Sequence, residues 1–220
     1  MNLSAVQQTA RNAIRRRRRP RTRGQSLVEF ALIFPIFMVL LLSLIEFMFL
    51  FNAQLSLNYA TRDAALVAAE AGNNANADCL ILQKIDQDLN PPTDETQVQT
   101  IHIFSATENG AQLTTPVEQI YTRGGTTSCG SLSVSYTLSA TQTYPANIRC
   151  SDLDRTGCSP TTTGPSNTGV DIIGVRIDYG YHFITPLGST VALIGSGQSL
   201  WNGTGMVMST GNAMRMEPIL

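Results

Sequence analysis

The sequence is poor in positive charge outside one short segment. Only one lysine, Lys84, occurs in 220 residues, and eight of the 15 basic residues precede Gln25, whereas all 16 acidic residues follow it. From Gln25 onwards, seven basic groups oppose 16 acidic groups, which gives a formal charge of -9. Because a nucleic-acid-binding domain carries its positive charge over a folded face, this distribution argues against nucleic acid as a partner.

Metal-binding and catalytic motifs are also missing. The four cysteines form no Cys-x-x-Cys pair, and His102 and His182 lie far apart in the sequence, which disfavours a zinc site. No Gly-x-Ser-x-Gly, His-Glu-x-x-His or phosphate-binding glycine loop occurs. The glycine pairs Gly124-Gly125 and Gly195-Ser-Gly197 are interpreted as turns. The sequence therefore predicts a non-catalytic protein and implies no metal or other cofactor.

A dense basic segment precedes a long apolar run. The basic segment at residues 15–23 ends at Gly24, and residues 27–51 are apolar with four exceptions, which are Glu29, Pro35, Ser43 and Glu46. Arginines beside such a run hold an N-terminus in the cytoplasm. About 20 apolar residues span the hydrocarbon layer, so residues 27–45 suffice. The alternatives for the basic segment are a nucleic-acid-binding arm and a solvated tail without a special role.

We predict that the apolar run remains as a membrane anchor. It is longer than the roughly 7–15 apolar residues of a removable secretory signal, and no small-x-small cleavage site closes it. Everything after Phe51 should then lie outside the cytoplasm. Membrane lipid is the expected partner of this anchor, which we represent by five residues: Leu27, Phe30, Pro35, Ile45 and Phe51.

All four cysteines fall in the predicted extracytoplasmic part, which suits an oxidising compartment. Four cysteines allow three disulfide connectivities. Among these we favour Cys79–Cys129 together with Cys150–Cys158. The second bridge would staple a long loop at residues 140–169, which are rich in Thr, Ser, Pro and Gly.

Two helices are expected. The first runs from Gln25 to Gly72, about 70 Å at 1.5 Å per residue, with a bend at Pro35. Its outer half, residues 52–71, is rich in alanine, contains neither proline nor glycine, and repeats larger apolar residues at near-helical spacing, namely Leu55, Tyr59 and Leu66. A second helix is expected at residues 78–89, with Asp78 as its N-cap and an apolar stripe at Leu82, Ile85 and Leu89.

The rest of the chain shows the alternation of β-strands. The clearest strands are expected at residues 132–138 and 175–183, and weaker ones at 97–104 and 206–216. Alternation predicts an antiparallel sheet with one covered face, and the outer half of the long helix is the natural cover. We therefore predict an α+β protein with a leader at residues 1–24, a long helix at 25–72 and an extracytoplasmic domain at 73–220.

Glu29 is an isolated acid near the start of the apolar run, where a charge is costly. Cleavage after Gly24 would create an α-amine on Gln25 that is mostly protonated at neutral pH. In a bundle of similar helices, this amine would neutralise Glu29 of a neighbouring subunit and fix the stagger between the helices. The alternative is a plain anchor whose Glu29 contacts only headgroup water.

This junction resembles the N-terminal segment of TadE-like minor pseudopilins of the Tad (tight adherence) pilus system, a branch of the type IV pilus superfamily. The resemblance rests on Arg23-Gly24-Gln25-Ser26-Leu27-Val28-Glu29-Phe30-Ala31-Leu32 with Pro35 soon after, on Leu44-Ile45-Glu46-Phe47, on residues 58–65, and on the ending Ala213-Met214-Arg215-Met216-Glu217.

The resemblance implies a pilin-like fold and cleavage between Gly24 and Gln25 by a membrane prepilin peptidase. It implies a non-catalytic role in assembling a Tad/Flp-type pilus for adhesion and surface attachment. Other pilins, pseudopilins and the Tad secretion machinery would be the partners, and the protein would sit as a single-pass protein in a bacterial cytoplasmic (inner) membrane or in the pilus. The alternatives are a membrane-anchored extracellular ligand-binding module and a membrane-tethered enzyme.

Overall fold

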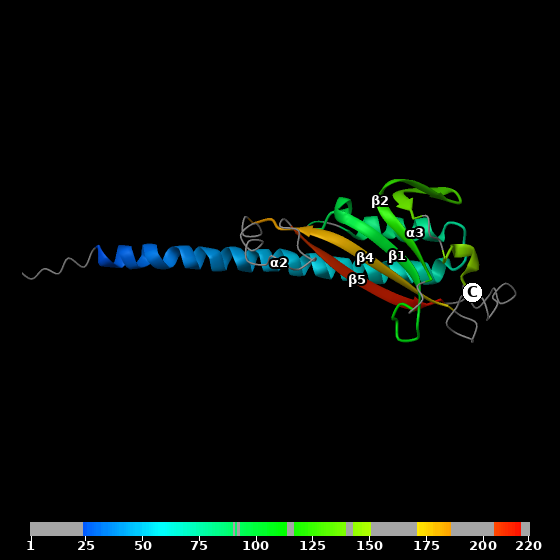
Figure 1. Ribbon diagram of the computed structural model, residues 1–220, viewed down its shortest axis with the longest axis horizontal. Helices are drawn as coiled ribbons and strands as arrows, with labels where there is room; N and C mark the ends of the chain where they lie inside the picture. The colour runs from blue at the N-terminus through cyan, green and yellow to red at the C-terminus, as the bar shows by residue number, and fades with distance from the viewer. Residues whose placement is uncertain are drawn as a thin grey trace, which may run out of the picture. The chain divides into compact units, whose positions relative to one another are not determined.

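The computed structural model describes residues 24–89, 91, 93–113, 117–139, 143–150, 171–185 and 205–216. The chain divides into two compact units between Leu44 and Ile45. The described part of the first unit consists of residues 24–44, which form the beginning of the long helix. The second unit contains the rest of that helix, a shorter helix and a β-sheet (Figure 1). The predicted leader, residues 1–23 before Gly24, lies outside the described residues.

The long helix, α2 (Gln25–Ala71), has 47 residues and confirms the prediction of one helix that continues from the apolar run into the domain. It continues through Pro35. It ends before Gly72, whose φ of 56° is the left-handed conformation that glycine adopts without a side-chain penalty.

The second helix, α3 (Ala77–Asp88), buries the predicted stripe of Leu82, Ile85 and Leu89. The prediction that Asp78 caps this helix is wrong. Asn76 occupies the N-cap position and makes no side-chain capping bond, whereas Asp78 lies in the first turn and is buried. The physical reason is that side chains of the sheet bind its carboxylate, as described below.

The sheet is antiparallel and has the strand order β3-β2-β1-β4-β5. Its strands are β1 (Val98–Ala106), β2 (Glu118–Cys129), β3 (Leu132–Leu138), β4 (Ile172–His182) and β5 (Gly205–Arg215). Four of them were predicted, and β2 was not. The interpretation of Gly124-Gly125 as a turn is wrong, because both glycines lie inside β2 at a shift of register, with φ of 105° and 76°. The pair Gly195-Ser-Gly197 lies outside the described residues.

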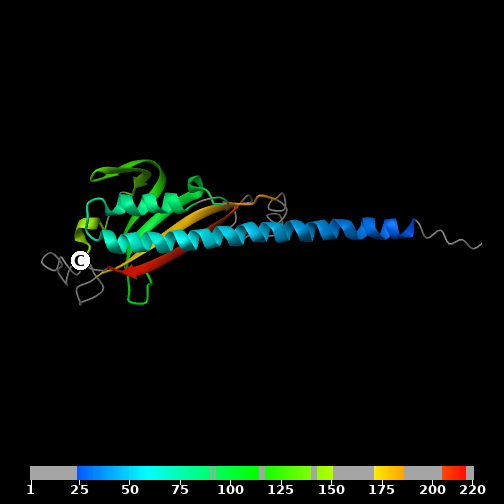
Figure 2. The ribbon, with the colours of Figure 1, turned by 180° about the vertical axis from the view of Figure 1, so that it is seen from behind.

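The domain core lies between the helices and one face of the sheet. The C-terminal half of α2 and all of α3 lie on the same side of the strands, as the two opposite views show (Figures 1 and 2). From α2, the core receives mainly alanine side chains, whose small size lets the helix pack close to the sheet. The fully buried residues of α2 are Ala53, Leu57, Ala60, Thr61, Ala64, Ala65 and Ala68. The sheet contributes Ile101, Ile103, Ile173, Val175 and Ile177.

The larger apolar residues of the same helix half lie on a different face. Leu55, Tyr59 and Leu66 keep 40%, 65% and 46% of their surface exposed. These three residues are called the outer stripe of α2 below. The predicted cover of the sheet is therefore confirmed, but alanines and Leu57, rather than the outer stripe, form it.

One disulfide links α3 to the sheet. It joins Cys79 in α3 to Cys129 at the end of β2, with the Cα atoms 5.7 Å apart and a sequence separation of 50. The predicted pairing of Cys79 with Cys129 is therefore confirmed. Cys150 is also disulfide-bonded. Its predicted partner Cys158, like most of the predicted loop, lies outside the described residues.

Candidate functional site

The segment at the predicted cleavage site presents its side chains outward. A Cβ atom added to Gly24 would meet nothing within 4 Å. The backbone oxygen of Gly24 accepts a hydrogen bond from the N–H of Val28 at 3.2 Å, which begins the helix. Nε2 of Gln25 donates to Oε1 of Glu29 at 3.1 Å, and both side chains are exposed. A carboxylate on an open helix face is available to a group from another molecule.

The side chains of the apolar run are exposed as well. Leu27, Phe30, Pro35, Ile45 and Phe51 all lie on the surface. Among the described residues, α2 is the single helix that is long and apolar enough to cross a membrane. A run of exposed apolar side chains requires cover from outside the chain, which lipid or other helices would provide.

Glu46, the second acid of the apolar run, is buried and fully occupied. Its Oε1 accepts hydrogen bonds from the hydroxyl of Tyr181 at 2.8 Å and from the N–H of Ile184 at 3.1 Å. Its Oε2 accepts from the N–H of Thr185 at 2.8 Å. These donors come from the end of β4 and the residues just after it. Because a buried carboxylate is costly without such partners, Glu46 ties α2 to this end of the sheet.

A buried ion pair joins α3 to Arg149, which lies between β3 and β4 in the sequence. Nη2 of Arg149, which is completely buried, lies 2.5 Å from Oδ1 of Asp78. Oδ2 of Asp78 accepts from the hydroxyl of Tyr121 at 2.7 Å and from Nε2 of Gln119 at 2.8 Å. Burial, together with the nearby carboxylate of Asp78, raises the pKa of Tyr121, so this phenol remains a donor. The network explains why Asp78 faces the sheet instead of capping α3.

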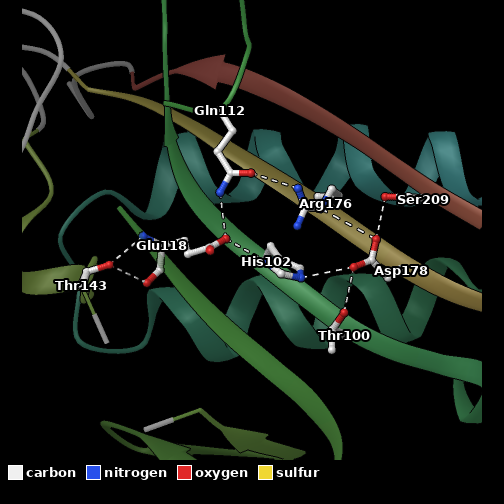
Figure 3. A network of polar contacts seen from close by, with 8 residues as sticks. All are labelled: Thr100, His102, Gln112, Glu118, Thr143, Arg176, Asp178 and Ser209. Atoms are coloured by element: carbon white, nitrogen blue, oxygen red, sulfur yellow. Dashed lines mark hydrogen bonds and ion pairs between the residues drawn. The ribbon is translucent and has the colours of Figure 1, made fainter. Parts of the chain in front are cut away.

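A third polar network occupies the face of the sheet opposite the helices (Figure 3). The imidazole of His102 lies between two carboxylates: Nδ1 is 2.9 Å from Oε2 of Glu118, and Nε2 is 3.2 Å from Oδ2 of Asp178. Asp178 also accepts hydrogen bonds from Thr100 at 2.9 Å and from Ser209 at 2.6 Å. The network thereby joins all three central strands to β5.

The protonation of His102 follows from these neighbours. Burial lowers the pKa of the imidazole, but the hydrogen bonds to Asp178 and Glu118 raise it by more, so the pKa of His102 lies above its ordinary value of 6.5. The same contact, with His102 as the main cause, lowers the pKa of Asp178. The imidazolium can donate to both carboxylates at once, whereas neutral histidine donates to only one.

We expect His102→Gln to make folding less stable below neutral pH. Because the pKa of His102 is higher in the folded than in the unfolded protein, protonation of His102 stabilises the fold. This stabilisation is complete below the unfolded pKa of about 6.5, and it disappears as the pH rises through the folded pKa. The loss should therefore be about 1–2 kcal/mol near pH 5.5 and smaller near pH 9, as measured by denaturant titration in detergent. The matched control is His182→Gln, because His182 is exposed at the end of β4. An equal loss at both pH values would contradict this assignment.

The predicted site residues are distributed over both units. Gly24, Gln25 and Glu29 lie in the first unit, and the described cysteines lie in the second. Local sequence patterns do not predict the partners of Glu46, Asp78 or His102. In the described part of the chain, no group of three or more His, Cys, Asp or Glu side chains could hold a metal ion.

One comparison with known families gives a match. Residues 24–66 match the family model described as TadE-like protein. The matched segment begins at Gly24 and contains Glu29, Pro35 and Glu46. The resemblance to TadE-like proteins is therefore confirmed over this segment. No curated protein and no solved structure matches the chain.

Proposed function

We propose that this protein, which carries a TadE-like segment at residues 24–66, is a minor pseudopilin that takes part in the assembly of a Tad-type pilus. The observation that carries the proposal is this family match. It covers the predicted cleavage site, the whole apolar run and the adjoining part of α2. The subunit would act through contacts with lipid and other subunits, without a reaction of its own.

The exposure of α2 supports the proposal. An assembling subunit needs surfaces that lipid covers first and other subunits cover later. The apolar run is exposed, and the outer stripe of Leu55, Tyr59 and Leu66 extends the apolar surface along the helix beyond it. Exposed apolar side chains that gather along one helix mark interaction sites, and here the exposed charges of Arg62 and Asp63 separate Leu66 from Tyr59. Other pilins and pseudopilins are the partners that we propose for it.

We also propose that a prepilin peptidase in the membrane cleaves the chain between Gly24 and Gln25. Gly24 precedes the helix, and its surroundings are open. A peptidase would therefore need to open only the first turn of α2, where the oxygen of Gly24 accepts from the N–H of Val28, to reach this peptide bond. Cleavage would remove the basic leader and leave the new α-amine one helical turn from Glu29.

The test is the N-terminus of the protein extracted from membranes. Sequencing should read from Gln25, and Gly24→Leu should leave the precursor uncut, because the added side chain would occupy the space of the glycine in the peptidase. Ser26→Ala is the matched control, since Ser26 is also exposed and lies beyond the cleaved bond. A mature protein that retains the arginines of residues 15–23 would refute the proposal.

A further inference from the structure

One end of the second unit carries large apolar side chains at its surface. On α2, Phe47 and Met48 are each 66% exposed, and Phe51 is 54% exposed. Ile184, just after β4, is 60% exposed. The N–H of Ile184 binds Glu46, the residue before Phe47. These four apolar residues, called the apolar collar below, therefore belong to the same end of the domain.

The position of this end along α2 follows from the length of the apolar run. Residues 27–45 extend about 28 Å at 1.5 Å per residue, which nearly equals the roughly 30 Å of the hydrocarbon core. Glu46 is then the first residue past the core, and Phe51 lies about 8 Å further along the helix. The interfacial layer on each side of the core is about 5–8 Å thick. Residues 46–51 therefore fall within this layer, and Ile184 is held beside them.

Glu46 holds the end of the sheet at this level. If the segment after β4 moved away from α2, the carboxylate would lose two of its three hydrogen bonds and keep only that from Tyr181, and the N–H groups of Ile184 and Thr185 would lose their acceptor. An edge-to-face contact between Tyr181 and Phe183, with ring centroids 5.8 Å apart, adds rigidity to the same segment. The exposure of Ile184 is thus imposed by a fixed backbone.

We infer that the apolar collar is a lipid-contact surface. Ile184 rests at the boundary between headgroups and acyl chains of the outer leaflet, and Glu46 is the positioning residue that holds it there. Lipid is the occupant because the collar continues, along α2, the apolar surface that the membrane covers. This inference rests on the membrane anchorage that the proposed function requires.

The experiment uses the full-length processed protein in vesicles of phosphatidylethanolamine and phosphatidylglycerol, with bromine atoms at chosen depths on the lipid chains. Single tryptophan reporters are placed in a Trp201→Phe background. Ile184→Trp reports on the collar, Phe37→Trp on the middle of the apolar run, and Leu80→Trp on an exposed site of α3 that follows the far end of α2.

We expect shallow bromines to quench Ile184→Trp about twofold, as for side chains at the headgroup boundary. Bromine atoms near the bilayer centre should quench Phe37→Trp. Bromine atoms at either depth should leave Leu80→Trp unquenched. If Phe37→Trp is quenched and Ile184→Trp is not, the lipid contact is refuted while the anchorage stands. If neither is quenched, the anchorage itself fails. In another outcome, the fluorescence of Ile184→Trp is unaffected by brominated lipid and changes with the number of protein molecules per vesicle. That result would identify a neighbouring subunit as the occupant and overturn the inference.

The role of Glu46 is tested in the Ile184→Trp reporter. Glu46→Gln keeps the shape of the side chain but replaces one acceptor oxygen by an amide donor that faces backbone N–H groups. Quenching at Ile184→Trp should fall to the level of Leu80→Trp. Glu70→Gln is the matched control, because Glu70 is exposed on the same helix. Unchanged quenching in Glu46→Gln would show that Glu46 does not position the collar.

Discussion

Glu29→Gln is expected to leave cleavage after Gly24 intact and to lower incorporation of the subunit into pili about tenfold or more. In Glu29→Gln the charge left without a partner is the α-amine of the neighbouring subunit; an unpaired charge at the centre of a membrane helix costs about 2.5–3.5 kcal/mol, and roughly 1.4 kcal/mol corresponds to a factor of ten. Between Gln25 and Ile45 the sequence holds no basic side chain, so the α-amine of a processed neighbour is the counter-ion we propose. The amide cannot form this ion pair.

The measurement compares the processed fraction in membranes with the amount of subunit in sheared pili. Glu29→Asp, which keeps the charge, should retain most of the assembly, and Glu70→Gln controls for the loss of one acid elsewhere on α2. If Glu29→Gln subunits assemble at the normal level, Glu29 contacts only headgroup water and the register hypothesis is wrong. A tethered ligand-binding module, the alternative function, would also tolerate this change.

The largest expected loss of stability comes from Arg149→Met. Arg149 is completely buried beside the carboxylate of Asp78, and methionine fills much of its volume without its charge. The variant should lose about 3–5 kcal/mol, because it leaves Asp78 buried without a counter-charge. Denaturant titration in detergent, followed by the near-ultraviolet signal of the buried tyrosines, measures this loss.

The double variant Asp78→Asn with Arg149→Met separates the charge from the packing. Asparagine retains an oxygen that can accept the hydrogen bonds of Tyr121 and Gln119. Nε and Nη1 of Arg149 have no hydrogen-bond partner among the described residues, which reduces the net benefit of the native pair. We therefore expect the double variant to be more stable than Arg149→Met alone. If the double variant instead loses the sum of the stabilities lost by the two single variants, the two charges do not compensate each other.

The sequence allowed prediction of α2, α3 and four strands because their apolar residues follow the helical or alternating period. The strand β2 does not show this alternation of apolar residues. Its side chains on the covered face include Gln119, Tyr121 and Arg123, two of which are polar or charged. They are tolerated there because carboxylates of α3 bind them: Asp78 binds Gln119, and Asp86 binds Arg123 at 2.8 Å. Such compensation between distant segments cannot be recognised from local periodicity.

Some features of the candidate sites could likewise be predicted from the sequence, whereas others could not. Glu29 was identified because a charge in an apolar run is conspicuous in sequence. Glu46 was equally conspicuous, but its donors lie at least 135 residues further along the chain. The surroundings of His102 were missed because Glu118 belongs to the strand that was not predicted. The sequence therefore indicates which groups need partners, and only the fold identifies the partners.

The disulfide between Cys79 and Cys129 has a mechanical consequence. β3 is an edge strand that pairs only with β2 in the described sheet, and hairpins at such an edge can unzip one hydrogen bond at a time under load. The covalent link ties the end of β2, next to that edge, to α3. A domain that is pulled by an external force would therefore resist peeling at this edge for as long as the bridge stays oxidised.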